Sequence, residues 1–559
     1  MTCTSSMMPK IFGVALMMVE CRTGSIAKKR TVLGRILARE TGRKQMRLSN
    51  YEMILPLIGA DEKEIDDRAL LVNGLYGAFD IVPKRCADFL IKGKFSQVDS
   101  SLWEQLARRG HITTKSLEEE IADLELLAHI DRRIIQKSRI DLIIMPTYDC
   151  NFRCPYCFER KRLARGETWL AKVMSHEMIQ AIFAALDDYR SRGYGLGNCT
   201  LYGGEPLMKE NLATVREIAE NCAQREMKIE VLTNGYDLAS FIPIIKEFPF
   251  VFVQVPLDGV GKTNDRLRRH KEGKDTYERI LNNVDMALEH GIGVNMRINI
   301  SKENLSSIDE LTDDLKRRGF LAKENERRMG QNQRGEFVHY FKATVTPDRN
   351  SFLGEGGVAR ELLESGRSAE YVMEHSCLYG IVARYIRKLF QKDTYVDFST
   401  AICNAERGAL LVDPYGLLFP CWESVGDDDM AVGRVDETQG RVLWNFAKAK
   451  WRLRTSDRIP ACRICPYNFF CKGGCAARAK DVYGDYFREY CGDHKQAFAF
   501  AASHIAGKMW QERGEAELSL SLAEPLAHLT RKERYMIMNS KSIPDVFAIV
   551  KKAGLLPQI

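Results

Sequence analysis

Three cysteines lie close together on one short segment, in the order Cys150-x3-Cys154-x2-Cys157. Three thiolates on one loop can bind three irons of a cubane cluster, whereas full protein ligation takes four cysteines. The fourth iron then stays open for a small chelating molecule. The alternative is a zinc site, but structural zinc prefers four protein ligands, and no further His or Cys lies close by in the sequence. The spacing therefore favours an iron–sulfur cluster with one open iron.

A second, larger group of cysteines lies between residues 403 and 491. Its members are Cys403, Cys421, Cys462, Cys465, Cys471, Cys475 and Cys491, and residues 462–475 read Cys-x2-Cys-x5-Cys-x3-Cys. Two sites of four ligands each need about this many thiolates. A zinc ribbon built on Cys462 and Cys465 alone is the alternative. We expect five other cysteines to be ordinary thiols, namely Cys3, Cys21, Cys86, Cys199 and Cys222.

The elements that must position the first group alternate between strand and helix from residue 141 onward. The predicted strands are Leu142–Met145, Cys199–Tyr202, Lys228–Thr233, Val251–Leu257 and Val294–Ile300, and the predicted helices are Ser175–Tyr189, Leu212–Arg225, Leu238–Glu247 and Tyr277–His290. Repeated strand–helix units predict a parallel sheet, and such sheets bind ligands at the carboxyl ends of their strands. Because the cysteine loop directly follows the first strand, we expect it at that edge.

A smaller unit precedes the alternating region. Its predicted elements are a strand at Tyr51–Leu57, a hairpin of Ala69–Val72 and Leu75–Val82 around Asn73-Gly74, short helices at Lys84–Ile91 and Ser101–Arg109, and a helix that begins after a capping box of Ser116 and Glu119 and ends near residue 137. A hairpin accompanied by short helices predicts a winged-helix-like module.

The bulk composition is that of a globular protein with several domains. The chain has 559 residues, of which 45% are hydrophobic, and a net charge of +7, so two to four domains are expected. No apolar run approaches the ~20 residues of a membrane-spanning helix, and the basic residues are not concentrated enough to favour nucleic-acid binding. Disulfides suit small secreted domains, so clustered thiols in a chain of this size predict a reducing, cytoplasmic location.

The cysteine spacing after the first strand of a strand–helix array resembles the radical S-adenosylmethionine (SAM) superfamily. The supporting motifs follow in the expected order, with Gly203-Gly204-Glu205-Pro206 after the second strand and Thr233-Asn234 after the third. The resemblance implies an α/β fold with a partial (β/α)6 TIM-like barrel that binds SAM and one [4Fe–4S] cluster. It also implies reductive cleavage of SAM to a 5′-deoxyadenosyl radical that abstracts a hydrogen atom.

The same resemblance implies cofactor contacts for individual residues. It places Tyr156 near the adenine, Gly203, Gly204, Glu205 and Pro206 at the methionine amino group, and Thr233 and Asn234 on the ribose side. Arg268 is the first candidate for the SAM carboxylate, since an arginine fork holds that group strongly, with Arg266, Arg269 and Arg297 as alternatives. Pro256 departs from the related pattern, which has a Ser there, so one hydroxyl contact to SAM is missing. No catalytic residue is assigned.

The second cysteine group resembles the SPASM extension of peptide- and protein-modifying radical SAM enzymes, which implies two auxiliary [4Fe–4S] clusters. By the interleaved pattern of that family, Cys403, Cys421 and Cys475 hold the first, and Cys462, Cys465, Cys471 and Cys491 hold the second. The first set is one ligand short. Cys377 is one candidate for the missing ligand, and an iron left open for substrate is the other.

The resemblance also bears on the substrate. The sulfatase-maturing branch, which makes formylglycine, has an acidic base directly after the second SPASM cysteine, where this chain has Trp422; Glu423 or Asp413 could replace it. We therefore expect oxidative modification of a ribosomally made peptide, giving a thioether or carbon-linked crosslink. The expected partners are a peptide or protein substrate with a leader peptide, bound by strand addition to the winged-helix-like module, and an electron donor such as flavodoxin or ferredoxin.

Three other functions stay open beside this one. They are formylglycine formation, a small-molecule radical SAM reaction, and a zinc-stabilised binding protein without enzymatic activity.

These predictions divide the chain into six segments. They are a flexible extension or over-long start at 1–45, the winged-helix-like module and a linker helix at 46–138, the partial barrel at 139–320, a linker at 321–399, the SPASM domain at 400–500 and a helical extension at 501–559.

Overall fold

A computed structural model describes residues 46–135, 139–300, 303–320, 344–347, 354–390, 399–403, 409–514, 519–540 and 542–555. Residues Met1–Arg47 and Leu48–Ile559 form two compact units, and the description below concerns the second. The extension expected at 1–45 lies outside the described residues.

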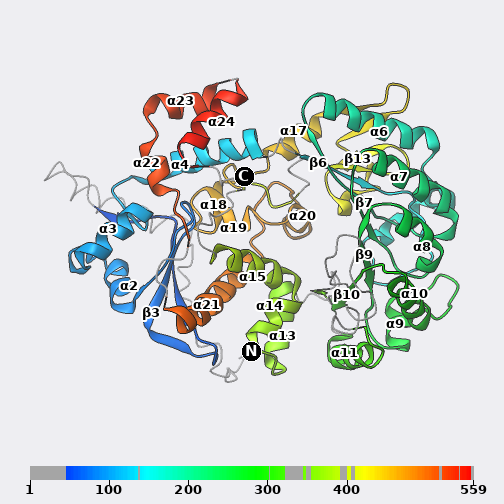
Figure 1. The fold of residues 1–559 in the computed structure, drawn as a ribbon, viewed down its shortest axis with the longest axis horizontal. Helices are drawn as coiled ribbons and strands as arrows, with labels where there is room; N and C mark the ends of the chain where they lie inside the picture. The colour runs from blue at the N-terminus through cyan, green and yellow to red at the C-terminus, as the bar shows by residue number, and fades with distance from the viewer. Residues whose placement is uncertain are drawn as a thin grey trace, which may run out of the picture. The chain divides into compact units, whose positions relative to one another are not determined.

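A ten-stranded sheet dominates the middle of the chain, in the order β11-β10-β9-β8-β7-β6-β12-β13-β14-β15. Six of its strands are parallel neighbours: β6 (Arg139–Ile144), β7 (Gly195–Leu201), β8 (Ile229–Leu232), β9 (Phe250–Pro256), β10 (Val294–Ile300) and β11 (Thr344–Pro347). The helices between them are α6 (His176–Ser191), α7 (Leu212–Gln224), α8 (Leu238–Glu247), α9 (Lys262–Leu267), α10 (Tyr277–Glu289) and α11 (Ile308–Arg317), seen in green on one side of the strands in Figure 1. The predicted α/β class with a parallel, barrel-type sheet is confirmed.

Burial along the strands explains how this sheet is built. In β10, Val294, Met296, Ile298 and Ile300 are buried, whereas the alternate residues are only partly covered. This period of two turns one face of the strand toward the helices, where it joins the main apolar core. The other face carries the polar side chains that are available to a site.

β6 continues the sheet in the other direction through a second, smaller part of the chain. β12 (Leu410–Val412) lies parallel to β6, and β13 (Leu417–Phe419), β14 (Gly433–Asp436) and β15 (Arg441–Trp444) follow it in antiparallel order. Short helices complete the cysteine-rich part, namely α17 (Phe446–Leu453), α18 (Pro460–Arg463), α19 (Asn468–Cys471) and α20 (Ala476–Tyr483). The cysteine-rich part therefore extends the same sheet as the parallel strands.

The N-terminal module is a three-stranded antiparallel sheet in the order β2-β3-β4. Its elements are β2 (Glu52–Ile58), β3 (Glu64–Asn73), β4 (Phe79–Pro83), α2 (Lys84–Ile91), α3 (Ser100–Arg109) and α4 (Leu117–Ile130), and α4 begins with the predicted capping box. The predicted strand Leu75–Val82 is wrong over residues 75–78. The Asn73 side chain accepts hydrogen bonds from the backbone N–H groups of Leu75 and Tyr76, which bends these residues into a turn.

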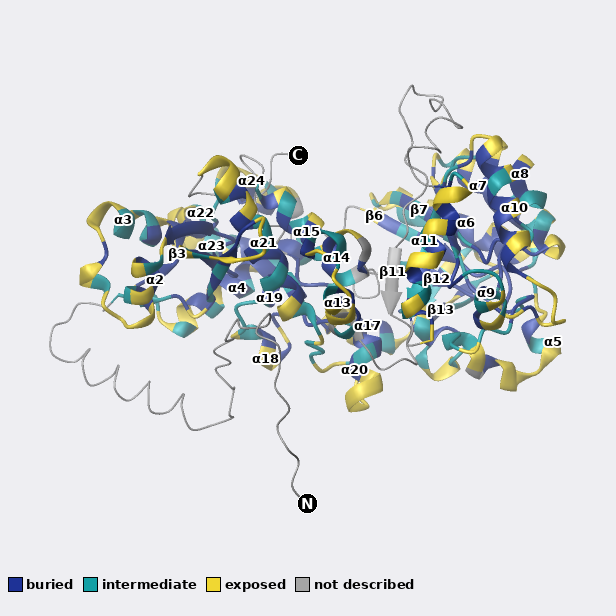
Figure 2. Ribbon diagram, turned by 90° about the horizontal axis from the view of Figure 1, so that it is seen from below, coloured by how far each residue is buried: buried dark blue, intermediate teal, exposed yellow. Residues whose placement is uncertain are grey.

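Helices from the second half of the chain cover one face of that small sheet. α14 (Ala369–His375), α15 (Cys377–Leu389) and α21 (His494–Arg513) form one apolar core with β2, β3 and β4. A Cβ atom at Gly507 of α21 would lie 2.1 Å from the Ile58 carbonyl oxygen, so only glycine allows this contact. Figure 2 shows the buried residues along β3 and the exposed ones on α2 and α3.

The remaining elements are β1 (Arg47–Leu48), β5 (Ile112–Thr113), α5 (Glu167–Leu170), α13 (Gly354–Glu364), α22 (Ala523–His528), α23 (Arg531–Asn539) and α24 (Ile543–Lys552). Among the described residues, none of the helices has both the length and the apolar character needed to cross a lipid bilayer.

Candidate functional site

The loop that carries Cys150, Cys154 and Cys157 follows β6 and is held along its length by backbone hydrogen bonds. The segment after α9 pairs with it: the Lys271 N–H donates to the Asn151 carbonyl oxygen at 2.8 Å, and the Arg153 N–H donates to the Arg269 carbonyl oxygen at 2.7 Å. The loop is therefore held in place by protein contacts, as a rigid ligand set requires.

The three thiols of this loop are close enough to affect one another's ionisation. Burial raises the pKa of Cys157 to about 12, with further contributions from Glu159 and Cys154. Burial also raises the pKa of Cys150, together with the charges of Glu205, Cys154 and Cys157. Thiolates in such a place need cations to stabilise them, and bound iron supplies these.

The glycine loop after β7 lies directly against the cysteine loop. Gly203 and Gly204 have φ angles of 86° and 52°, and a Cβ atom at Gly204 would lie 2.3 Å from the Asp149 carbonyl oxygen. That same carbonyl accepts the Glu205 N–H at 2.8 Å. A side chain at Gly204 would force the two loops apart, so the glycine is required by the close approach.

Glu205 joins the glycine loop to the loop after β8. Its buried carboxylate accepts hydrogen bonds from the Thr233 hydroxyl at 2.6 Å, the Asn234 N–H at 2.5 Å and the Leu207 N–H at 2.8 Å. Burial raises its pKa to about 7 in spite of these bonds. The Asn234 amide in turn donates to Asn151 Oδ1 at 2.6 Å, so the loops after β6, β7 and β8 form one connected unit.

Tyr156, Asp258 and Arg268 form a buried cluster on the other side of the cysteine loop. The Tyr156 hydroxyl donates to Asp258 Oδ2 and accepts from an Arg268 terminal nitrogen at 2.7 Å. The guanidinium of Arg268 lies 5.6 Å from the Phe152 ring, and its Nε is buried without a hydrogen-bond partner among the described residues. A buried donor without an acceptor is unusual in proteins and needs an explanation, which a bound ligand can supply.

The structure separates Arg268 from its alternatives. Arg268 is buried, whereas Arg266 is exposed and pairs with Glu303 on the surface, and Arg269 is exposed. Arg297 lies on β10 opposite Pro256, at the register where the related pattern has its missing Ser. Arg269 contacts the cysteine loop through its backbone carbonyl, whereas Arg268 contacts it through its guanidinium, which donates to the Tyr156 hydroxyl.

The second cysteine group falls into two sets in space. The pKa of Cys421 is raised to about 12 by burial and by two neighbouring thiols, those of Cys403 and Cys475. The pKa of Cys471 is raised to about 12 by burial and by Cys491 and Cys465. The pKa of Cys462 is raised by burial and by the same three neighbours, Cys471, Cys465 and Cys491.

The neighbouring thiols are members of the same interleaved sets, and their role as cluster ligands stays a prediction. α15 begins at Cys377, whose side chain lies outside the described residues.

Two contacts connect the segments after β6 and β7 to the hairpin β12–β13 and the segment after it. The Tyr148 hydroxyl donates to Asp413 Oδ2 at 2.7 Å, and the other Asp413 oxygen accepts two backbone N–H groups of the hairpin turn. Farther along, the Trp422 ring meets the edge of Tyr202, with ring centres 4.8 Å apart. Tyr202 directly precedes the glycine loop, so the residue after Cys421 lies beside the candidate SAM site.

Glu159 and Arg162 form a charged link between the glycine loop and the segment that follows β13. The sequence analysis did not single out either residue. Glu159 accepts the Gly204 N–H at 3.0 Å and pairs with Arg162 at 2.9 Å, and Arg162 donates to the Trp422 carbonyl oxygen at 3.1 Å. The available signal was the position of Glu159 two residues after the last cysteine. Asp258 directly follows the predicted strand Val251–Leu257, and its contact with Tyr156 spans 102 positions, so the local sequence gives no sign of it.

Comparison with known proteins agrees with this geometry. Residues 144–315 match the family model described as the Radical SAM superfamily. This part of the chain is similar to radical SAM domains. Its relatives include an AdoMet-dependent heme synthase of Methanosarcina barkeri (24% identical over 362 residues, 62% of this chain and 94% of the relative) and the mycofactocin maturase MftC of Mycobacterium tuberculosis (22% over 335 residues, 59% and 76%).

One further relative, the Fe-coproporphyrin III synthase of Methanosarcina barkeri, is matched over 39% of its own length. A solved structure, native anSMEcpe with bound AdoMet, aligns with 66% of this chain and 97% of its own at 14% identity and a TM-score of 0.47.

A radical SAM domain takes SAM and a [4Fe–4S] cluster, and the residues present fit both. Three neighbouring thiols match a cluster with one open iron, the glycine loop allows a ligand to approach the backbone, and the unpartnered Nε of Arg268 is suited to a carboxylate. Among the described residues, no three His, Cys, Asp or Glu side chains stand at the spacing of a single metal ion.

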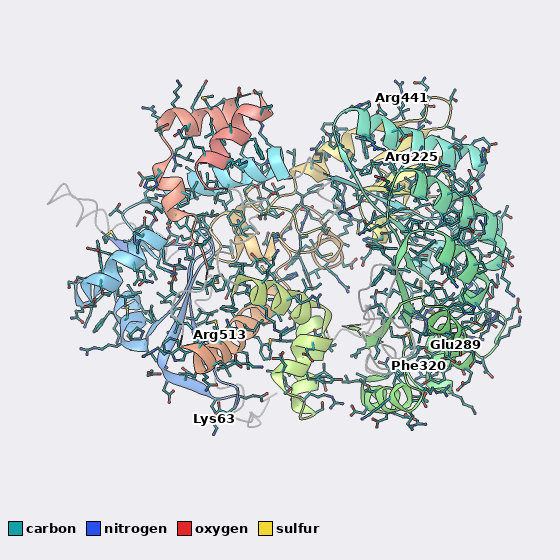
Figure 3. The ribbon with its side chains drawn as sticks, viewed as in Figure 1. Lys63, Arg225, Glu289, Phe320, Arg441 and Arg513 are labelled. Carbon is teal, nitrogen blue, oxygen red and sulfur yellow. The ribbon has the colours of Figure 1, made fainter. Side chains whose placement is uncertain are left out.

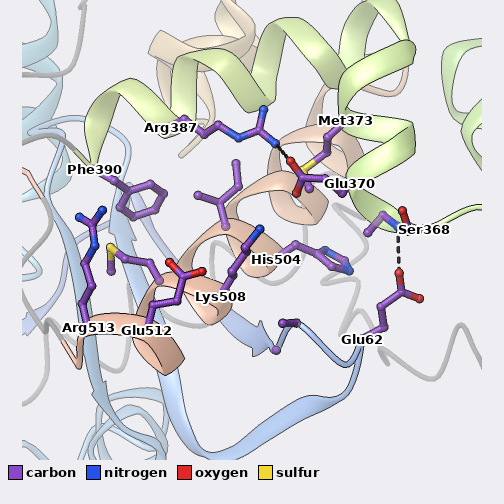
Figure 4. A pocket seen from close by; sticks show the side chains of 15 residues that line it. Glu62, Ser368, Glu370, Met373, Arg387, Phe390, His504, Lys508, Glu512 and Arg513 are labelled. Carbon is purple, nitrogen blue, oxygen red and sulfur yellow. Dashed lines mark hydrogen bonds and ion pairs between the residues drawn. The ribbon is translucent and has the colours of Figure 1, made fainter.

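A separate cavity of about 680 Å³ lies between the β2–β3 turn, α14, α15 and α21. Figure 4 shows its mixed lining, in which Arg387 pairs with Glu370 and Glu62 accepts the Ala369 N–H at 2.9 Å. None of the residues predicted for SAM or iron lines it, so the cavity is distinct from the candidate site.

Proposed function

We propose that this radical SAM enzyme oxidatively modifies a ribosomally made peptide, forming a thioether or carbon-linked crosslink. The observation that carries the proposal is the presence, in the same chain as the radical SAM loop, of two further sets of neighbouring thiols. An oxidative crosslink leaves one electron to be removed after hydrogen abstraction, and auxiliary iron–sulfur clusters are suited to accept it.

Cys150, Cys154 and Cys157 would hold the catalytic cluster, and Arg268 with the glycine loop would hold SAM. When bound, these groups supply the electron and the carbon radical that abstracts hydrogen from the substrate. The protein's part is to position them. Glu205 fixes the loops after β7 and β8 relative to the cysteines, and the burial of the site excludes water, which protects a radical from side reactions.

Recognition of a peptide is supported by the N-terminal module and by one relative. In the order β2-β3-β4, both outer strands are edges to which an extended leader peptide can add. The word maturase in the name of the mycofactocin relative also indicates that this relative acts on a precursor. The heme synthase relative favours a small-molecule substrate instead, and it is the second candidate.

Formylglycine formation is less well supported by the residues near Cys421. Trp422 stands where the sulfatase-maturing branch has its acidic base. Asp413, one replacement considered, is buried and its oxygens already accept hydrogen bonds from Tyr148 and the hairpin backbone. An acid held in this way is suited to shaping the turn.

The first test is the substitution Cys154→Ala in anaerobically reconstituted enzyme. We expect 5′-deoxyadenosine formation under dithionite to be abolished, because the cluster loses one of its three thiolates. Cys86→Ala, which removes a buried thiol of α2, is the matched control and should leave the rate unchanged. Equal turnover in Cys154→Ala and the wild type would contradict the assignment.

Metal analysis separates the enzyme from a zinc-stabilised binding protein. The enzyme should contain about eight to twelve irons per chain, whereas zinc without iron would contradict it. Mass spectrometry of a peptide encoded next to this gene, co-expressed with the enzyme, should show the loss of a pair of hydrogen atoms per crosslink.

A further inference from the structure

The segment 441–454 is unusually basic. It contains Arg441, Lys448, Lys450, Arg452 and Arg454 and no acidic residue. The next acid along the chain, Asp457, is buried and paired with Arg132 at 2.8 Å. Burial lowers the pKa of Lys448 to about 8 and covers Arg454, so the exposed positive charge on α17 comes from Lys450 and Arg452. Figure 3 shows Arg441 pointing outward.

Helix α17, within this segment, exposes two apolar side chains and buries a lysine. Lys448, Trp451 and Arg454 are buried, whereas Phe446 and Leu453 are 77% and 51% exposed. Phe446, Lys450 and Leu453 are spaced i, i+4, i+7 and share the exposed face. Exposing a Phe and a Leu on one face leaves apolar surface in water, and such apolar surface is typical of an interaction site.

The buried face of α17 rests on the loops that carry the SPASM-type cysteines. The Trp451 ring centre lies 5.4 Å from that of Tyr486. Arg454 donates to the carbonyl oxygens of Gly473, at 3.2 Å, and Tyr486, at 2.6 Å. Gly473 lies between Cys471 and Cys475 in the chain, and Tyr486 precedes Cys491. The exposed face is thus about one helix diameter, ~10 Å, from these loops.

We propose that the exposed surface formed by Trp444 of β15 and by Phe446, Lys450, Arg452 and Leu453 of α17, here called the α17 patch, docks an acidic one-electron carrier protein. This inference rests on the proposed function, which needs an electron from outside the chain. An apolar centre with basic neighbours complements a carrier with an acidic rim around its exposed cofactor. Electron-transfer complexes use small interfaces, and a single helix face is large enough for one.

The position and charge of the patch favour this partner over others. A leader peptide binds by strand addition, and α17 offers no strand edge. The patch lies against the cysteine loops, where a carrier must approach closely to transfer charge. In the transfer, the flavin hydroquinone of the carrier would lose one electron and become the semiquinone. An oxidised iron–sulfur cluster held by the cysteines of this enzyme would gain that electron.

The test uses the reconstituted enzyme, with flavodoxin as the probe. Lys450→Glu and the double variant Lys450→Glu/Arg452→Glu should lower flavodoxin-driven formation of 5′-deoxyadenosine about tenfold at low salt, because steering by opposite charge is lost. The dithionite-driven rate should stay unchanged, because dithionite needs no docking surface. Titration of oxidised flavodoxin should show the same loss in affinity, and Phe446→Ser should weaken binding with little change in its salt dependence.

Lys532→Glu, an exposed lysine on α23, is the matched control and should leave both rates unchanged. The proposal would be overturned if the ratio of the flavodoxin-driven rate to the dithionite-driven rate were the same in all variants. So would binding of the patch to anionic phospholipid vesicles in place of flavodoxin. A wild-type enzyme that cleaves no SAM with dithionite would instead reject the proposed function, so the two failures are distinguishable.

Discussion

Arg162 shows how one side chain can connect the SAM site to the cysteine-rich part. It pairs with Glu159, which binds the glycine-loop backbone, and it donates to the carbonyl beside Cys421. Arg162→Met would leave the largely buried Glu159 without its charge partner. We expect the KM for SAM to rise about tenfold, since an unpaired buried group costs about 1–3 kcal/mol. The measurement is SAM cleavage under dithionite at several SAM concentrations, with the iron content determined for each variant.

Arg165 provides the matched control for this prediction, because it lies one turn farther along and pairs with Asp428 on the surface at 3.0 Å. Arg165→Met should leave the KM unchanged, as exposed pairs contribute little. Arg162→Lys, which keeps the charge but cannot bridge both partners as a guanidinium does, should lie between Arg162→Met and the wild type. A fully loaded Arg162→Met enzyme with the wild-type KM would show that the bridge does not position the glycine loop.

Residues within one short motif could be found from the sequence, whereas contacts between distant residues could not. The cysteine loop and the glycine loop are each defined by a few adjacent positions. The Tyr156–Asp258 contact depends on how β9 and the cysteine loop meet at one edge of the sheet, and nothing in the local sequence of either residue records it. The choice of Arg268 over Arg266 likewise needed burial, which spacing alone does not give.

Among the elements, the N-terminal module contains a fully buried ionic network that should make its stability depend on pH. His111 contacts Glu52 at 2.8 Å and Asp80 at 2.6 Å, and Arg109 also binds Asp80 at 2.6 Å. Burial alone would lower the pKa of His111, but the Glu52 charge and the hydrogen bonds with Asp80 and Glu52 raise it from 6.5 to about 9. The folded module therefore holds the His111 proton more tightly than the unfolded chain does.

Because the folded pKa lies above the unfolded one, this stabilisation is fully present below pH 6.5 and is lost as the pH rises through about 9. The change is on the order of 3 kcal/mol. Hydrogen exchange of the β2, β3 and β4 amides, corrected for intrinsic rates, should show weaker protection at about pH 9 than at about pH 6. His111→Gln should remove most of this difference, and the exposed His528→Gln should keep it. An unchanged pH dependence in His111→Gln would assign the effect to other groups.

The bounds of helices and strands could be predicted where the hydrophobic pattern extends over many residues. They could not be predicted where contacts with distant residues determine the secondary structure. β10 and α8 have the predicted bounds, because each carries a full apolar pattern. β11 was not predicted, since four residues are too short for a period to be recognised, and it is a strand through its pairing with β10. The turn at residues 75–78 depends on the Asn73 side chain, which the hairpin signal did not reveal.

At the scale of the whole molecule, the N-terminal module and the cysteine-rich part meet closely. A Cβ atom at Gly74 would lie 1.6 Å from the Pro466 carbonyl oxygen, and the Tyr51 hydroxyl donates to the Arg463 carbonyl. Both contacts fall beside Cys465, in the set that also contains Cys462 and Cys471. The module proposed to hold the leader therefore lies directly on the loop proposed to hold an auxiliary cluster.

Cys465→Ala tests whether that second set takes part in the reaction or only in folding. We expect the iron content to fall by about four per chain, while the radical SAM loop keeps its cluster and dithionite still drives 5′-deoxyadenosine formation. The crosslinked peptide should not form, because the electron left after hydrogen abstraction has lost its acceptor. Cys86→Ala serves again as the control, with full iron and normal product. If Cys465→Ala made product at the normal rate, the set would be structural, and the auxiliary role would pass to Cys403, Cys421 and Cys475.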